Sequence, residues 1–170
     1  DVVPMQAGQH FQIITKVNDK WVQRSYTPVS DLNAPMVELL IKVYHEGPMS
    51  TYLSNLPVHS KVWMKGPLGH FIYNQGMAQM INMFACGSGI TPMWQVINSI
   101  YKNTDDTTQV LFVHGCRHDN ELALFDQLSQ ISSKRPQIRV THTLSLPSNT
   151  WKGSKGRIST DNYDSFSPFP

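Results

Sequence analysis

The sequence predicts a two-domain protein in which an antiparallel β-barrel is followed by an α/β domain built on a parallel sheet. Three observations carry this prediction. The chain has 170 residues, which is enough for one large domain or two small ones with a buried core. Up to about residue 75, short β-rich runs are separated by Pro, Gly and Asn. From residue 79 onward, apolar strands alternate with helical patterns.

The first part of the chain has strand-like runs interrupted by one helical segment. Short strands broken by turn residues are typical of an antiparallel barrel or sandwich. The helical segment is residues 48–56, where Pro48 suits a first helical turn. In this segment Met49, Leu53 and Leu56 fall on one helical face. The predicted strands cover residues 8–17, 20–27, 37–44, 60–66 and 69–73.

The second part alternates strands with helices. Parallel neighbours in a sheet need a crossover element of about a dozen residues, so this order predicts a parallel sheet with crossover helices. A boundary is expected at residues 74–78, which divides the chain into domains 1–76 and 77–170. The predicted strands are 79–86, 107–116 and 137–145, and the predicted helices are 91–103 and 120–132.

The composition is that of an ordinary globular protein. Lys and Arg total 14, Asp and Glu total 12 and the net charge is +2, which excludes a polybasic nucleic-acid binder and a disordered acidic tail. Cys86 and Cys116 form neither a disulfide framework nor a CxxC pattern, which favours a reducing compartment, and the seven histidines show no metal spacing. No apolar run reaches about 18 residues and no export signal opens the chain, so any membrane anchor is expected outside it.

A glycine-containing turn joins a predicted strand to a predicted helix at residues 86–93, Cys-Gly-Ser-Gly-Ile-Thr-Pro-Met. Glycines there let backbone amides approach a ligand, and the helix N-terminus would face that ligand with partial positive charge. This geometry suits a phosphate. The alternative is that a tight strand-to-helix turn needs glycine for steric reasons alone, and two glycines do not distinguish the readings.

A second candidate is the run Arg24-Ser25-Tyr26-Thr27-Pro28, which closes a predicted strand. Alternation along a strand places Arg24 and Tyr26 on one face. That face could offer a guanidinium to a pyrophosphate and an aromatic ring to a planar heterocycle. Taken singly, the run also fits an edge strand with a solvated arginine.

Four motifs in order change this balance: RSYTP, IKVYHEGPMSTYL, GPLGHF and GSGITPM. Their combination resembles the flavoprotein reductases of the ferredoxin-NADP reductase superfamily, most closely the cytochrome b5 reductase family. The resemblance extends from Gly8 to about Ser159, nearly the whole chain. It implies that domain 1–76 is an FAD-binding β-barrel and that domain 77–170 binds NADH or NADPH.

The resemblance also assigns individual residues. Arg24 is expected to pair with the FAD pyrophosphate and Tyr26 to pack on the flavin. The expected catalytic residues are Thr27 near flavin N5, Lys42 in the pocket shared with the nicotinamide, and Thr91, which touches the flavin from the second domain. The full set implied for cofactor binding is Arg24, Ser25, Tyr26, Thr27, Lys42, Tyr44, Gly47, Met49, Ser50, Thr51, Gly87, Gly89, Thr91, Pro92 and Ser145, with no metal ligand.

The function implied by the resemblance is hydride transfer from NAD(P)H to FAD, followed by single-electron transfer to a haem or iron–sulfur acceptor. A cytochrome b5 domain, in the same chain or in another, is one example of such an acceptor, and the sequence does not decide among them. Two alternatives stay open: the reductase module of a multidomain oxygenase or nitrate-reductase-like protein, and a non-catalytic flavin- or nucleotide-binding scaffold. The expected location is cytoplasmic, including the cytosolic face of the endoplasmic reticulum or the mitochondrial outer membrane.

The chain departs from the family pattern at both ends and in the nucleotide region. It starts after the usual first barrel strand and stops before the family's final Cys-Gly-Pro motif, so a partial chain is expected. Family members specific for NADH tend to carry an acidic residue where this sequence aligns Ser145. Without that repulsive group, and with Lys152, Lys155 and Arg157 following, NADPH is expected to be accepted at least as well as NADH. The alternative is that these basic residues form only a solvated loop.

Overall fold

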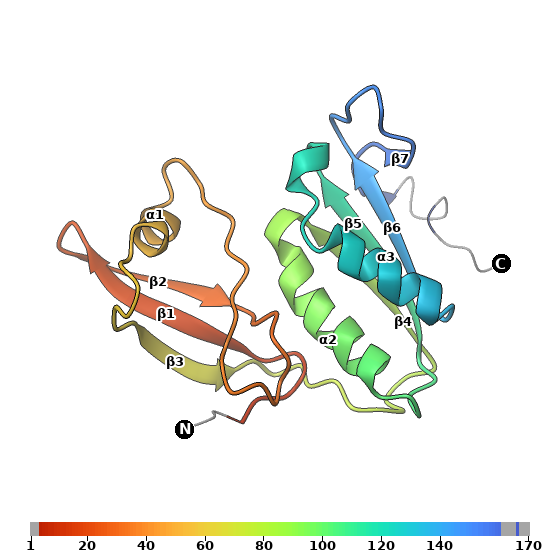
Figure 1. The fold of residues 1–170 in the computed structure, drawn as a ribbon, viewed down its shortest axis with the longest axis horizontal. Coiled ribbons are helices and arrows are strands. Elements are labelled where there is room, and N and C mark those ends of the chain that lie inside the picture. Colours follow the sequence, from red (N-terminus) through yellow and green to blue (C-terminus); the bar gives the residue numbers. More distant parts are fainter. Residues whose placement is uncertain (1–3, 161–165, 167–170) are drawn as a thin grey trace.

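The structure is a computed structural model that describes residues 4–160 and residue 166 of the chain. Two sheets lie side by side, one in each half of the chain, and helix α2 (Ile90–Lys102) lies on the side of the second sheet that faces the first sheet (Figure 1). The described part therefore has the predicted order, an antiparallel sheet followed by an α/β unit. The end of the predicted second domain, residues 161–165 and 167–170, lies outside the described residues.

The first sheet of the described residues contains β1 (His10–Val17), β2 (Lys20–Tyr26) and β3 (Trp63–Leu68) in the order β2-β1-β3. All pairings are antiparallel. Phe11 and Ile13 alternate along β1 and are buried on one face of this sheet. The short helix α1 (Pro48–Ser54) packs against β1 and β2, and it begins at the proline that the sequence predicts for a first turn.

Two of the predicted strands are wrong. Residues 37–44 form no strand and share only one isolated bridge, Leu39 with Pro28. None of these residues is buried, and the apolar side chains of Val37, Val43 and Tyr44 are exposed. Residues 69–73 also form no strand. In this segment the amide of Tyr73 donates to the carbonyl of Ala7 at 2.8 Å, and its hydroxyl donates to Asp106 of the second domain at 2.6 Å. Burial raises the pKa of Tyr73 to about 12, so the phenol keeps this proton.

The second sheet is parallel over its described strands, as predicted, with the order β4-β5-β6-β7. The glycine turn after β4 is a short 3-10 helix, η1 (Gly87–Gly89), that leads directly into α2. The short final strand was not predicted. The strands are β4 (Met80–Cys86), β5 (Gln109–Cys116), β6 (Ile138–Leu144) and β7 (Ser154–Lys155), and a further helix is α3 (Phe125–Lys134).

The helix predicted at residues 120–132 begins later than expected. Residues 119–121 form a separate 3-10 turn, η2 (Asp119–Glu121), and α3 starts only after Leu124, whose φ is +58°. The carboxylate of Asp119 accepts hydrogen bonds from the amide and the hydroxyl of Ser148, both at 2.9 Å. These bonds join η2 to the loop after β6, and the left-handed backbone of Leu124 separates η2 from α3.

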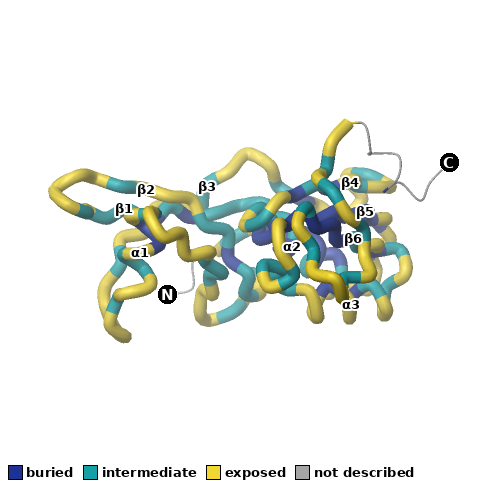
Figure 2. Tube along the Cα trace, turned by 90° about the horizontal axis from the view of Figure 1, so that it is seen from above, coloured by how far each residue is buried: buried dark blue, intermediate teal, exposed yellow. Residues whose placement is uncertain are grey.

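The core lies in the second sheet. Figure 2 shows the buried residues gathered on β4, β5 and β6, while the β1–β2 hairpin is exposed. Phe112 on β5 is fully buried beneath α2 and α3, together with Ile97, Ile100 and Leu128. Burying one such side chain contributes about 1.5–3 kcal/mol. Because β5 is covered on both faces, its sequence is a continuous apolar run rather than an alternating one.

Helix α2 also connects the two domains. The indole of Trp94 donates to the carbonyl of Val29 at 2.8 Å, and the amide of Gly8 donates to the side-chain oxygen of Gln95 at 2.6 Å. Near the other end of α2, Asp31 pairs with Lys102. These contacts orient the carboxyl ends of β4 and β5 toward the first domain. The exact boundary at residues 74–78 stays a prediction.

Candidate functional site

Two cavities of similar size meet where the domains face each other. The barrel-side cavity has a volume of about 440 Å³ and lies against β2, α1 and the segment before α1. The sheet-side cavity has a volume of about 420 Å³ and lies against the carboxyl ends of β4, β5 and β6. Both fall within the range of about 300–1,000 Å³ that is usual for ligand pockets. Among the described residues, those that line both cavities are Lys42, Tyr44 and Ser88.

The cavities bring together most of the residues that the sequence analysis selected. Nine of them line the barrel-side cavity, and Gly87 and Ser145 line the sheet-side cavity. Thr27, Thr51, Gly89 and Pro92 are not among the lining residues of either cavity. The nine are Arg24, Ser25, Tyr26, Lys42, Tyr44, Gly47, Met49, Ser50 and Thr91.

Strand β2 contributes a cation and an aromatic ring to the barrel-side cavity. Arg24 pairs with Ile13 and Tyr26 with Phe11 across the β1–β2 ladder, so both project to the face on which Ile13 and Phe11 are buried. The guanidinium of Arg24 donates to the carbonyl of Gln23 at 2.8 Å. Burial raises the pKa of the Tyr26 phenol, which therefore stays neutral at physiological pH.

The loop before α1 is held by the hydroxyl of Ser50. That hydroxyl accepts from the amide of Tyr44 and donates to the carbonyl of Gly47, both at 3.1 Å. A Cβ at Gly47 would lie 2.5 Å from the same hydroxyl oxygen, so glycine is needed there to let the loop close. Ser50 thus shapes the wall of the cavity from a buried position.

The turn after β4 exposes backbone to the sheet-side cavity. Gly87 has a φ of +52°, and a Cβ placed on it would meet no atom within 4 Å. Open space beside a glycine backbone is what a ligand that approaches the main chain requires. Gly89 differs, because its φ is −63° and a Cβ there would make ordinary contact with Ala85 at 3.5 Å.

A buried histidine supports this turn, and the sequence analysis did not find it. His114 on β5 is fully buried, and its Nε2 lies 3.0 Å from the carbonyl oxygen of Gly87. Since a carbonyl accepts only, the imidazole must carry its proton on Nε2. Burial lowers the pKa of His114, which keeps the ring neutral. Only the parallel pairing of β4 with β5, which aligns Ala85 with His114, brings these groups together.

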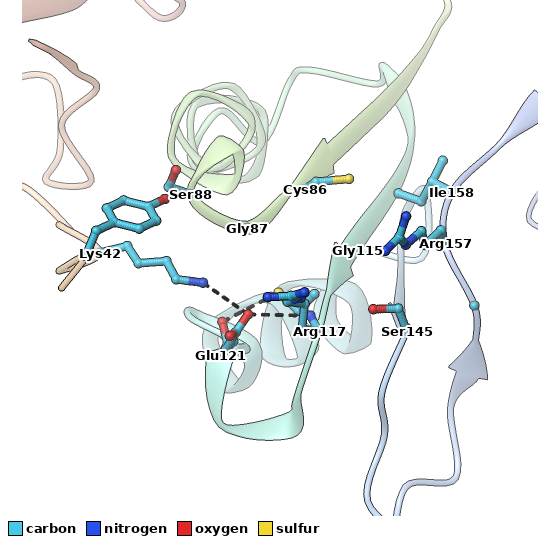
Figure 3. Close-up of a pocket in the computed structure, with 13 residues that line it drawn as sticks. Lys42, Cys86, Gly87, Ser88, Gly115, Arg117, Glu121, Ser145, Arg157 and Ile158 are labelled. Atoms are coloured by element: carbon cyan, nitrogen blue, oxygen red, sulfur yellow. Dashed lines mark hydrogen bonds and ion pairs between the residues drawn. The ribbon is translucent and has the colours of Figure 1, made fainter. Parts of the chain in front are cut away.

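The sheet-side cavity is basic, with one carboxylate on its wall. Arg117 and Arg157 line it, and Lys42 reaches it from the first domain (Figure 3). The ammonium of Lys42 lies 3.1 Å from a carboxylate oxygen of Glu121. Bonding to Lys42 lowers the pKa of Glu121, so this carboxyl is ionised. The sequence analysis named Arg157 as a basic residue that could favour NADPH, and the structure places it on the cavity wall. It did not select Glu121, because nothing in the local sequence marks that residue.

Neither a metal site nor a membrane span is found in the described residues. Across residues 4–160 and 166, no three His, Cys, Asp or Glu side chains are placed to share a metal ion. Over the same residues, none of the helices is both long and apolar enough to cross a bilayer.

Comparison with known proteins assigns both halves of the chain. Residues 1–73 match the family described as "Oxidoreductase FAD-binding domain", and residues 83–168 match "Oxidoreductase NAD-binding domain". The chain therefore belongs to the family of oxidoreductases with FAD-binding and NAD-binding domains. Most residues that line the barrel-side cavity lie in the FAD-binding match, and most that line the sheet-side cavity lie in the NAD-binding match.

Relatives of known name are similar over the whole chain. An NADH-cytochrome b5 reductase 1 of Dictyostelium discoideum is 37% identical over 171 residues, which is 100% of this chain and 60% of that protein. One of Mortierella alpina is 34% identical and is covered over 57% of its length. The chain thus spans about 60% of the length of these relatives.

The fold is also that of solved family structures. The cytochrome b5 reductase domain of Ulva prolifera nitrate reductase matches with a TM-score of 0.87 and 29% identity, over 95% of this chain and 69% of that one. The CS-b5R domains of human Ncb5or, in the NAD⁺ form, match with a TM-score of 0.79 and 26% identity, over 94% of this chain and 48% of that one. The predicted two-domain fold is confirmed.

Proposed function

We propose that the protein is a flavin-dependent reductase that accepts a hydride from NADH or NADPH and delivers single electrons to a haem or iron–sulfur acceptor. The observation that carries the proposal is the meeting of the two cavities at Lys42, Tyr44 and Ser88. A flavin in one cavity and a nicotinamide in the other would approach each other there. The redox chemistry is supplied by FAD when it is bound, and the protein supplies position and electrostatics.

The barrel-side residues fit FAD. Arg24 offers the guanidinium for the pyrophosphate, and Tyr26 offers a neutral ring for the flavin. Gly47, Met49 and Ser50 shape the end of the cavity where the diphosphate would lie. In this proposal Thr27, Ser25 and Thr51 act beside these groups, as the sequence resemblance implies, with Ser25 on the cavity wall.

The sheet-side residues fit a nicotinamide dinucleotide. Gly87 presents open backbone, and Lys42 brings a cation from the first domain. Thr91, in the first turn of α2, lines the barrel-side cavity, so it would face the flavin from the second domain. Ligands of parallel sheets bind at the carboxyl ends of the strands, which is where this cavity lies. Ser145 and Arg157 on its wall support the proposal that the 2′-phosphate of NADPH is tolerated, since neither repels an anion.

The relatives suggest two kinds of electron acceptor. The names of the relatives favour cytochrome b5, in the same chain or in another. The similarity to a domain of Ulva prolifera nitrate reductase supports the second candidate, a reductase module within a larger protein. The location at the cytosolic face of the endoplasmic reticulum or the mitochondrial outer membrane stays a prediction.

The proposal is tested on the full-length protein. Added FAD should be retained with flavin absorbance, NADH or NADPH should bleach it under anaerobic conditions, and cytochrome b5 should then be reduced. A protein that takes up no FAD is no flavoprotein. One that retains FAD but is not bleached by either nicotinamide is the non-catalytic scaffold that the sequence analysis left open.

A further inference from the structure

The ion pair between Lys42 and Glu121 crosses from one domain to the other. Lys42 lies in the segment before α1, and Glu121 ends η2, far along the chain. Their charged atoms are 3.1 Å apart, and the two side chains keep 38% and 24% of their surface exposed. Figure 3 shows Lys42 reaching across the cavity toward the carboxylate. Partly exposed ion pairs of this kind contribute little to the free energy of folding. Stability alone therefore does not explain why this pair spans the cavity.

The carboxylate of Glu121 has a second donor. The oxygen that faces Lys42 also accepts from the backbone amide of Arg117 at 3.4 Å. An ammonium group and a main-chain amide converging on one anionic oxygen are the groups with which proteins bind phosphate. Both donors line the sheet-side cavity, as does Glu121 itself.

The charges around the cavity are uneven. Lys42, Arg117 and Arg157 are basic, and Glu121 is the only acidic residue among the described residues that line it. A dinucleotide carries negative phosphates, so a single carboxylate on this wall opposes the ligand that the rest of the wall favours. The same carboxylate neutralises Lys42, the cation that belongs to both cavities.

We propose that Glu121 is an internal stand-in for the ligand: its carboxylate occupies the anion subsite formed by Lys42 and the amide of Arg117, and a dinucleotide phosphate displaces it. This inference rests on the proposed function. In the empty protein the ion pair links the domains and shields Lys42. In the loaded protein Lys42 turns to the phosphate, and the released carboxylate weakens binding by repulsion. Glu121 is thus a positioning residue that limits dinucleotide affinity and favours product release.

The test is the dissociation constant of NAD⁺ for the FAD-loaded, full-length protein, measured by titration calorimetry without turnover. Glu121→Gln keeps the size of the side chain and removes its charge, so NAD⁺ should bind about threefold to tenfold more tightly. Asp126→Asn is the matched control. Asp126 lies in the first turn of α3 and lines neither cavity, and its substitution should leave the dissociation constant unchanged.

A second pair of variants separates the stand-in from a general charge effect. In a Lys42→Gln background the subsite has lost its cation, so Glu121→Gln should tighten NAD⁺ binding much less than in the wild type. The midpoint of thermal unfolding should change by no more than about 2 °C in Glu121→Gln, because the pair is exposed. Glu121→Ala provides the same comparison if the glutamine variant is poorly folded.

The outcomes distinguish this inference from the proposed function. Wild-type protein that binds NAD⁺, with a Glu121→Gln variant that binds it equally or more weakly, overturns the stand-in role and leaves the reductase proposal intact. An equal gain in both backgrounds also overturns it, because the effect would then not act through Lys42. Wild-type protein that retains FAD but binds no NAD⁺ overturns both.

Discussion

The substitution Gly87→Ala tests whether a dinucleotide approaches the backbone of the turn after β4. Gly87 has a φ of +52°, and a Cβ there would meet no atom within 4 Å. The added methyl group therefore causes no clash within the protein. It still costs about 1 kcal/mol, because an L-residue is strained in the left-handed region. For a chain of this size that cost lowers the midpoint of thermal unfolding by about 2–4 °C.

The same methyl group projects into the sheet-side cavity, whose wall includes Gly87. If the dinucleotide lies against this backbone, the methyl group displaces it. We expect NAD⁺ to bind at least about tenfold more weakly, which corresponds to about 1.4 kcal/mol. FAD retention should be unaffected, because Gly87 does not line the barrel-side cavity. Thermal unfolding and NAD⁺ titration of the FAD-loaded protein measure the two effects separately.

Gly76→Ala is the matched control. Gly76 has a φ of +79°, a Cβ there would also meet no atom within 4 Å, and the residue lines neither cavity. It should show a similar loss of stability with unchanged NAD⁺ binding. If Gly87→Ala loses the same stability as Gly76→Ala and binds NAD⁺ like the wild type, the dinucleotide does not approach this turn and the reasoning fails.

Three further substitutions test other parts of the site and the fold. Arg24→Ala should weaken FAD retention by about one to two decades, since a charge-assisted hydrogen bond contributes about 1.5–3 kcal/mol; unchanged flavin fluorescence on dilution would show that Arg24 does not contact the pyrophosphate. Ser145→Asp should lower the kcat/KM for NADPH relative to that for NADH, and a ratio that stays constant would remove Ser145 from cofactor discrimination. His142 is buried, and burial together with the adjacent His114 lowers its pKa from 6.5 to about 4, so the folded state resists a proton that the unfolded state accepts. Its contribution to stability is present above pH 6.5 and is lost as the pH falls toward 4, by about 2 kcal/mol at pH 5. Urea unfolding at pH 7 and pH 5 should show this loss in the wild type and little of it in His142→Leu, and an equal loss in both would assign it to other groups.

Local sequence was sufficient for the elements whose residues contact mainly their own neighbours. The apolar run of β5 and the pattern of α2 predict both elements to within two residues, because burial on both faces or on one helical face leaves a direct periodic signal. The apolar run at residues 37–44 misled, because none of these residues is buried and Val37, Val43 and Tyr44 are exposed. A short apolar run indicates which residues suit a strand, but it does not show whether a neighbouring strand is there to pair with it.

What the sequence by itself determined was therefore the order of the elements, the glycine turn before α2, and the motifs RSYTP and GSGITPM with their family resemblance. Only the tertiary structure decided that Gly87, and not Gly89, faces open space, and that His114 supports it. It alone also placed Glu121 against Lys42. These contacts join residues far apart in the chain, and the pairing of β4 with β5 and the docking of α2 against the first domain bring them together. A local sequence pattern indicates which side chains are buried, but it does not indicate which distant residue each of them contacts.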